Sequence, residues 1–134
     1  MKPKVIHSYE GFDGGNKIEK FTENFVMHID LSRPFYLKKT FDWIMSLEVG
    51  EHIPQQYEDT FIDNMIRHCK KGIIISWAIP NQPGRGHVNL KSNEYIIKKM
   101  KEKNLIHDIQ SQNYLRRKTS FKYLKTNIMV FRKY

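Results

Sequence analysis

The segment Ile73–Ile79 constrains the fold of this chain most, because it is apolar at nearly every position. An apolar run of this length is typical of a β-strand covered on both faces, as in the middle of a parallel sheet. The preceding segment Gln55–Lys71 has helical spacing, and Gly72 stands where such a helix would end. The apolar stripe predicted for this helix contains Tyr57, Phe61, Ile62, Met65 and Cys69. A buried strand that follows an amphipathic helix indicates an α/β fold.

Other patterns extend this alternation of strands and helices along the chain. Short strands are predicted over Lys4–Phe12, Phe25–Ile29 and Phe41–Val49. Ser92 is a candidate cap for a helix that runs to Lys103. The C-terminal part is predicted to form strands over Ile106–Leu115 and Ile128–Tyr134, with a helical or irregular Arg116–Leu124 between them. We therefore expect one domain over residues 1–134, with a mostly parallel sheet and an antiparallel closing strand.

The cysteine content and the apolar runs limit where the chain functions. Cys69 is the single cysteine, so an internal disulfide bond is impossible and a reducing, cytoplasmic environment is predicted. No apolar run approaches the roughly 20 residues that cross a bilayer. The N-terminal residues Met-Lys-Pro-Lys-Val-Ile-His lack the apolar centre of a secretory signal. These features predict a cytoplasmic protein without a membrane partner.

The charge is distributed unevenly along the chain. Residues 1–64 contain 7 Lys and Arg against 11 Asp and Glu, whereas residues 65–134 contain 16 against 3. A basic half is compatible with binding to nucleic acid or another polyanion. The strongest candidate is the run Arg116-Arg117-Lys118 with the aromatic residues Phe121 and Tyr123 nearby. Such runs are more often solvated surface, so nucleic acid is the alternative partner and not the favoured one.

Polar residues follow each of the first four predicted strands. Ligands of open α/β sheets bind beyond the carboxyl ends of the strands, so these residues are expected to share one edge of the sheet. We therefore predict a binding edge there. Its candidate residues are Asp13 after the first strand, Asp30 and Leu31 after the second, Glu48, Glu51 and His52 after the third, and Arg85, His87 and Asn89 after the fourth.

Three segments resemble the class I S-adenosylmethionine-dependent methyltransferases. These are Gly11-Phe12-Asp13-Gly14, Ile29-Asp30-Leu31-Ser32 and Phe41–Pro54, and the similarity extends over residues 5–105. The resemblance implies a Rossmann-like α/β sandwich, S-adenosylmethionine as the cofactor and methyl transfer to an unidentified acceptor. A small-molecule acceptor is expected because no segment looks like a module that recognises a larger one. The alternative is a non-enzymatic module whose basic C-terminal half binds a polyanion.

The resemblance also implies roles for individual residues. Asp13 matches the acidic residue that holds the ribose hydroxyls of the cofactor, and Asp30 with Leu31 matches the adenine contacts. Ser46–His52 matches the loop that faces the sulfonium, which assigns Glu48 to the cofactor. His52 and His87 are the candidate catalytic bases, and Glu51, Arg85 and Asn89 are the candidate acceptor contacts.

The sequence departs from the family pattern at its start. The family's glycine-rich loop, which holds the methionine part of the cofactor, would precede Lys4. We therefore expect a chain that is truncated at its N-terminus and lacks the first strand and helix of the family. A partner or a second copy is then expected to complete the sheet, and the chain as written is expected to bind S-adenosylmethionine weakly.

The spacing Glu48-x-x-Glu51-His52 is also similar to that of ubiquinone-pathway O-methyltransferases, in which such a group binds a divalent cation. Two carboxylates and an imidazole are suitable ligands. However, Glu51-His52 matches a loop that is common in the larger superfamily, mostly without a metal. The sequence alone therefore favours no metal here.

Overall fold

The computed structural model describes residues 6–134, and the chain divides into two compact units. The first unit ends at Leu31, and the second is Ser32–Tyr134. Among residues 6–134, no helix is both long enough and apolar enough to span a membrane.

The first unit contains two short parallel strands. Strand β1 (Gly11–Asp13) pairs with β2 (Val26–His28), with Gly11 opposite Val26 and Asp13 opposite His28. Helix α1 (Ile18–Phe21) connects them. The strand predicted over Lys4–Phe12 is therefore placed too early, and its residues Lys4 and Val5 lie outside the described part. The strand predicted over Phe25–Ile29 is confirmed in a shorter form.

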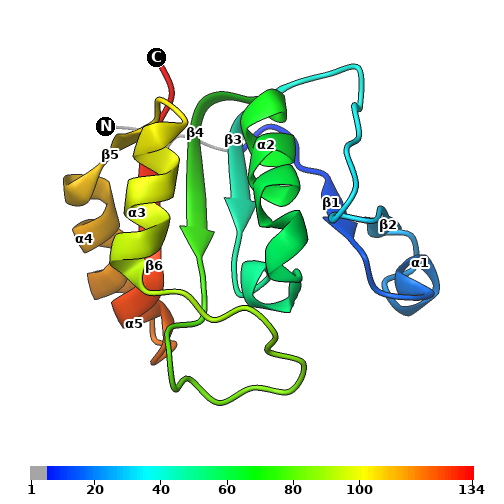
Figure 1. Cartoon of the computed structure of the whole chain (residues 1–134). Helices are drawn as coiled ribbons and strands as arrows, with labels where there is room; N and C mark the ends of the chain where they lie inside the picture. Colours follow the sequence, from blue (N-terminus) through cyan, green and yellow to red (C-terminus); the bar gives the residue numbers. More distant parts are fainter. Residues whose placement is uncertain (1–5) are drawn as a thin grey trace. The chain divides into compact units, whose positions relative to one another are not determined.

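The second unit is built on a four-stranded mixed sheet with the order β3-β4-β6-β5 (Figure 1). Strand β3 (Phe41–Ser46) runs parallel to β4 (Cys69–Ser76), whereas β6 (Ile128–Arg132) is antiparallel to both β4 and β5 (Ile106–His107). Strands β3, β4 and β5 thus share one direction, and β6 is the antiparallel closing strand that the sequence predicts. Within the described residues, β3 is paired on one side only.

Helices pack against this sheet and bury its central strands. Helix α2 (Glu58–His68) contacts β3 and β4, α3 (Asn93–Glu102) contacts β5 and β6, and α4 (Ile109–Lys118) contacts β6 (Figure 1). Short helices η1 (Gly50–His52), η2 (Gln55–Tyr57) and α5 (Leu124–Asn127) complete the unit. The core side chains are apolar and nearly inaccessible to solvent, and they include Ile62, Ile73, Ile75, Trp77, Ile96, Met100, Met129 and Phe131.

The end of α2 differs from the prediction. Cys69 was expected on the helix stripe, but the helix ends at His68 and Cys69 begins β4, where it pairs with Phe41. Gly72 does not stop a helix. It lies inside β4, and a Cβ atom there would overlap the ring of Trp43 and the carbonyl oxygen of Phe131. Pairing with β3 therefore outweighs the helical spacing of this segment.

The segment Ile106–Leu115 is also different from the prediction. Only Ile106 and His107 are in a strand, and α4 follows directly. Asp108 caps this helix, because its side chain accepts hydrogen bonds from the backbone N–H and the hydroxyl of Ser111 at 2.9 and 2.8 Å. The two closing strands pair as expected, but α4 and α5 connect them. The predicted helix capped by Ser92 is confirmed, with Ser92 Oγ accepting from the backbone N–H of Tyr95.

Candidate functional site

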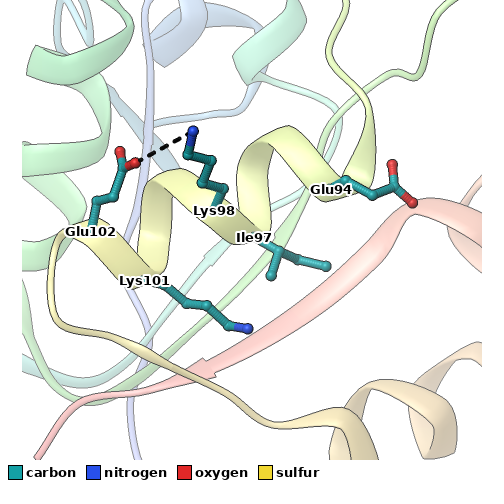
Figure 2. Close-up of a pocket in the computed structure, with 5 residues that line it drawn as sticks. All are labelled: Glu94, Ile97, Lys98, Lys101 and Glu102. Atoms are coloured by element: carbon teal, nitrogen blue, oxygen red, sulfur yellow. Dashed lines mark ion pairs between the residues drawn. The ribbon is translucent and has the colours of Figure 1, made fainter.

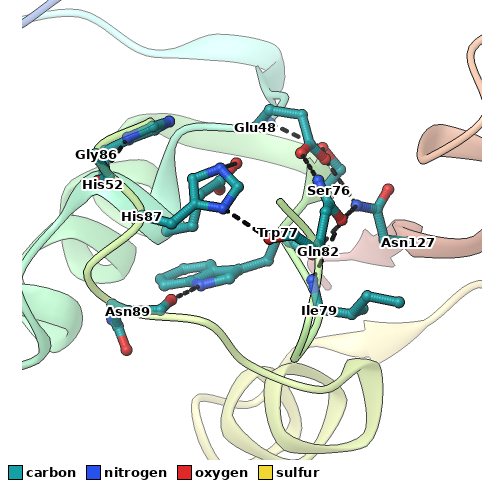
Figure 3. A network of polar contacts seen from close by, with 11 residues as sticks. Glu48, His52, Ser76, Trp77, Ile79, Gln82, Gly86, His87, Asn89 and Asn127 are labelled. Atoms are coloured by element: carbon teal, nitrogen blue, oxygen red, sulfur yellow. Dashed lines mark hydrogen bonds and ion pairs between the residues drawn. The ribbon is translucent and has the colours of Figure 1, made fainter. Parts of the chain in front are cut away.

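Three segments of the second unit meet at one edge of its sheet. Strands β3 and β4 are parallel neighbours, so the loops that follow Ser46 and Ser76 begin side by side. Ile128, the first residue of β6, pairs with Ser76, which places the preceding Asn127 at the same edge. Figure 3 shows the side chains that these segments bring together. The predicted convergence of Glu48, His52 and His87 is thus present within this unit.

Glu48 lies at the centre of a hydrogen-bond network (Figure 3). Its Oε1 accepts from the Ser76 hydroxyl at 2.9 Å and from the Asn127 side-chain amide at 2.7 Å, and its Oε2 accepts from the Gln82 amide at 2.7 Å. The backbone N–H of Glu48 also donates to Ser76 Oγ at 2.8 Å. The carboxylate is therefore held in one orientation by residues from β4, the following loop and the end of α5.

The backbone of Glu48 has a φ of 55°, in the left-handed region that few non-glycine residues occupy. Such a conformation costs about 1–3 kcal/mol and persists where surrounding contacts fix it. Here Ser76 binds both the backbone and the carboxylate of Glu48. These two contacts fix the backbone conformation of Glu48 and the direction of its carboxylate together.

Glu51 is buried without a hydrogen-bond partner for its carboxylate. Its side chain is 0% exposed, and neither carboxylate oxygen accepts a hydrogen bond from any residue among 6–134. Burial raises the pKa of Glu51, and the nearby Glu48 carboxylate raises it further. A buried carboxylate without partners is costly, and a hydrogen-bond donor or a cation placed against it would offset that cost.

His52 and His87 lie beside each other, with ring centroids 5.1 Å apart. The Nδ1 of His52 donates to the carbonyl oxygen of Gly86 at 2.9 Å, and the Nδ1 of His87 donates to that of Gln82 at 3.2 Å (Figure 3). A neutral imidazole that donates from Nδ1 keeps a lone pair on Nε2. The Nε2 of His87 lies 3.9 Å from Glu51 Oε1. Both rings therefore retain Nε2 as a base or a metal ligand.

Two glycines give the histidines their positions. A Cβ atom on Gly84 would overlap the ring of His87, and Gly86 has a φ of 77° with its Cβ position 3.3 Å from His52 Nδ1. Any other residue at either position would displace an imidazole or strain the backbone. The Gly84-Arg85-Gly86 segment is not a phosphate-binding loop. Its two glycines instead leave the space that the rings of His52 and His87 occupy.

The two other candidate residues of the loop after β4, Asn89 and Arg85, differ in burial and in their contacts. Asn89 is 4% exposed, its side-chain amide donates to Glu58 Oε2 at 2.9 Å, and its backbone carbonyl accepts from the Trp77 indole N–H at 2.6 Å. Its amide is therefore committed within the fold. The backbone N–H of Asn89 also donates to the Glu51 carbonyl at 3.0 Å, which ties the loop to η1. Arg85 is exposed on the same loop.

Asp13, Asp30 and Leu31 belong to the first unit. Asp13 ends β1, and its Oδ1 accepts from the backbone N–H of Gly15 at 2.6 Å. The backbone N–H of Ile29 donates to the Asp13 carbonyl at 3.0 Å, so Asp30 and Leu31 follow the carboxyl end of the adjacent strand. Asp30 is exposed and Leu31 is half-buried. The unit thus presents two carboxylates after neighbouring parallel strands.

No pattern in the sequence marks Ser76, Gln82 and Asn127 as site residues. Asn127 is 79 residues from Glu48, and a polar residue before a terminal strand has no distinctive pattern. Gln82 lies in a segment that was predicted as a loop. Gln82 is distinguished from other loop residues by its burial, because only 7% of its surface is exposed. This burial can be seen in the structure but not in the sequence.

A shallow surface depression on α3 lies outside this site. It is lined by Glu94, Ile97, Lys98, Lys101 and Glu102, with Lys98 and Glu102 forming an ion pair at 3.9 Å (Figure 2). A second depression is lined by residues of β5, α4 and the C-terminus. Neither depression is lined by a residue that the sequence analysis proposes for the site, and both are open to solvent.

The basic run at the end of α4 is partly used by the fold. Arg116 donates from Nε to the carbonyl oxygen of Ile128 at 2.9 Å, and burial lowers its pKa. Arg117 and Lys118 are exposed, as is Phe121. One of the three consecutive basic side chains is therefore a structural group and not a free phosphate contact.

Comparison with known proteins identifies the fold. No protein-family model and no curated protein matches the sequence. Among solved structures, magnesium protoporphyrin IX methyltransferase (ChlM) from Synechocystis PCC 6803 with bound SAM matches 88% of this chain with a TM-score of 0.54 and 17% identity. The same enzyme with bound SAH matches 80% of the chain with a TM-score of 0.53 and 15% identity. A structure described as "A Pericyclic Reaction enzyme" matches 81% with a TM-score of 0.54 and 11% identity.

These likenesses establish a methyltransferase-like, Rossmann-like α/β fold. The matched part covers 51% and 49% of the two ChlM chains and 30% of the third chain. The chain therefore spans about half the length of the methyltransferase that it resembles. The fold class predicted from the sequence is confirmed.

Proposed function

We propose that this chain binds S-adenosylmethionine and takes part in methyl transfer to a small-molecule acceptor. The observation that carries the proposal is the polar edge after β3 and β4, where a network fixes Glu48 beside two histidines. In the open α/β folds to which this chain belongs, that edge is where ligands bind. The structurally similar ChlM, solved with SAM and with SAH, supports the choice of cofactor.

The candidate nucleoside contacts Asp13, Asp30 and Leu31 all belong to the first unit. A carboxylate has about four lone-pair positions, so Asp13 keeps acceptor capacity for ribose hydroxyls beyond its hydrogen bond from Gly15. Asp30 has the carboxylate that an exocyclic amine requires as an acceptor, and Leu31 has an apolar side chain of the kind that packs on an adenine ring. These residue types fit a nucleoside.

The second unit would act on the sulfonium and the acceptor. The sulfonium is an activated methyl donor, so positioning and exclusion of water supply much of the catalysis. The anionic Glu48 would lie toward the positive sulfonium, and its fixed orientation suits this role. The Nε2 of His52 or His87 would accept the proton from an acceptor hydroxyl, with Glu51 and the exposed Arg85 contacting the acceptor.

The nucleoside contacts can be tested by substitution. Each hydrogen bond to a charged group contributes about 1.5–3 kcal/mol, so Asp13→Asn and Asp30→Asn should each weaken binding of S-adenosylhomocysteine about tenfold or more. The matched control is Asp42→Asn, which removes a surface carboxylate paired with Lys71. Equal affinities of all three variants and the unaltered chain would refute the assignment.

A further inference from the structure

The structure places three potential metal ligands together in η1, which follows β3, and in the loop after β4. Glu51, His52 and His87 each offer one ligand atom, and these three atoms lie within 4.8 Å of one another. Two of the residues are adjacent in η1, and the third is brought in by the loop that hydrogen-bonds to the Glu51 carbonyl through Val88 and Asn89. The cluster therefore depends on the fold and not on the sequence spacing alone.

Glu51 supplies an independent indication of a bound cation. Its side chain is 0% exposed, yet both carboxylate oxygens have no hydrogen-bond partner among residues 6–134. The Oε1 atom faces His87 Nε2 at 3.9 Å. Buried charges are normally paired or coordinate metals. A cation at this point would satisfy the orphaned oxygens.

The two histidines are oriented as metal ligands usually are. Metal-binding imidazoles generally donate their other ring N–H to a carbonyl or carboxylate, which fixes the ring. His52 and His87 both donate from Nδ1 to a backbone carbonyl, of Gly86 and Gln82 respectively, and both keep Nε2 available. Gly84 and Gly86 provide the space for these two positions.

We infer that Glu51, His52 and His87 bind a divalent transition metal such as Zn²⁺ through one carboxylate oxygen and the two Nε2 atoms. Bonds of about 2.0–2.1 Å in a tetrahedral site separate the ligand atoms by about 3.4 Å, so small side-chain rotations close this cluster around an ion. Two histidines and one carboxylate leave a coordination position for water or an acceptor oxygen, which is the arrangement of catalytic metal sites. With the ion bound, this open position would replace the imidazole base of the proposed function, because both Nε2 lone pairs would then hold the metal.

This ligand set differs from the Glu48, Glu51 and His52 group that the sequence suggests. The Glu48 oxygens already accept hydrogen bonds from Ser76, Asn127 and Gln82. Glu48 would therefore lie outside the group of residues that bind the ion directly. His87, 35 positions after His52, takes the third place. The expectation of no metal rested on the Glu51-His52 pattern alone and did not include this residue.

Titration of the metal-free full chain with Co²⁺, followed by visible absorption and by displacement with Zn²⁺, tests the site without any methyl-transfer assay. We expect one ion per chain and at least tenfold weaker binding in Glu51→Gln, His52→Ala and His87→Ala. His28→Ala, which removes an exposed histidine of the first unit, is the control and should bind as tightly as the unaltered chain.

His52 is exposed, so His52→Ala is the variant that tests the site with least risk to folding. Circular dichroism of each variant establishes that it is folded before the titration. Binding of unchanged affinity in folded His52→Ala, or no Co²⁺ or Zn²⁺ binding by the unaltered chain, would overturn the inference. Because the readout is the metal itself, its result is independent of whether the chain binds S-adenosylmethionine.

Discussion

The side-chain amide of Asn127 donates to Glu48 Oε1 at 2.7 Å, which joins the residue before the last strand to the loop after β3. The same amide nitrogen lies 3.3 Å from the Trp77 carbonyl. Asn127 is fully buried. This contact couples the stability of the C-terminal strand to the orientation of the candidate site carboxylate.

Asn127→Ala should therefore destabilise the protein as well as loosen Glu48. Loss of a buried partner leaves an unsatisfied acceptor, which costs about 1–3 kcal/mol. Urea denaturation of the full chain measures this as a lower midpoint with an unchanged slope. Asn113→Ala, at an exposed position of α4, is the control and should change the free energy of unfolding by less than about 0.5 kcal/mol. Equal stabilities of the two variants would show that the Asn127 contact is unimportant.

Gly84→Ala should displace the His87 imidazole, because the new Cβ would occupy the space of the ring. The expected result is a change in the His87 ring resonances in an NMR spectrum and weaker Co²⁺ binding, with the fold retained. Gly14→Ala is the control, since the nearest atom to its Cβ position is the Ile29 carbonyl oxygen at 3.5 Å. Unchanged His87 resonances in Gly84→Ala would contradict the account of this loop.

Asp108 should make the stability depend on pH in acid. The backbone N–H of Ser111 and the Arg132 side chain lower the pKa of Asp108 from 3.8 to about 2. A lowered pKa means that its ionised form stabilises the folded state above about pH 3.8, and this contribution is lost as the pH falls toward 2.

Asp108→Asn keeps a side chain able to cap α4 but removes the charge. The difference in free energy of unfolding between the unaltered chain and this variant should be constant above pH 5 and should shrink between pH 4 and 2.5, measured by urea denaturation. A difference that stays constant over the acid range would show that the charge of Asp108 contributes nothing.

Much of the fold follows from local patterns, and the errors have identifiable causes. The apolar run Ile73–Ile79 predicts the central strand because burial on both faces leaves few polar positions. Cys69 was assigned to a helix because its spacing fits the stripe, but pairing with Phe41 on β3 decides its place. Ile106–Leu115 was assigned to a strand because the capping of α4 by Asp108 was not recognised.

The candidate site was predictable only in part, for a similar reason. Residues that directly follow parallel strands, such as Glu48 and His87, can be placed at one edge from the strand order alone. Residues that hold them come from distant parts of the chain, such as Asn127, and no local pattern marks them. The burial of Glu51, which supports the metal site, likewise results from tertiary packing.

Amide chemical-shift mapping of the ¹⁵N-labelled full chain with S-adenosylhomocysteine tests the proposed function most directly, because it also detects weak binding. The account predicts saturable shifts at Asp13, Asp30 and Leu31 and in the segment from Glu48 to His52, with the shifts at these residues reduced in Asp13→Asn. No shifts at millimolar ligand, or shifts confined to α3 and α4, would contradict it.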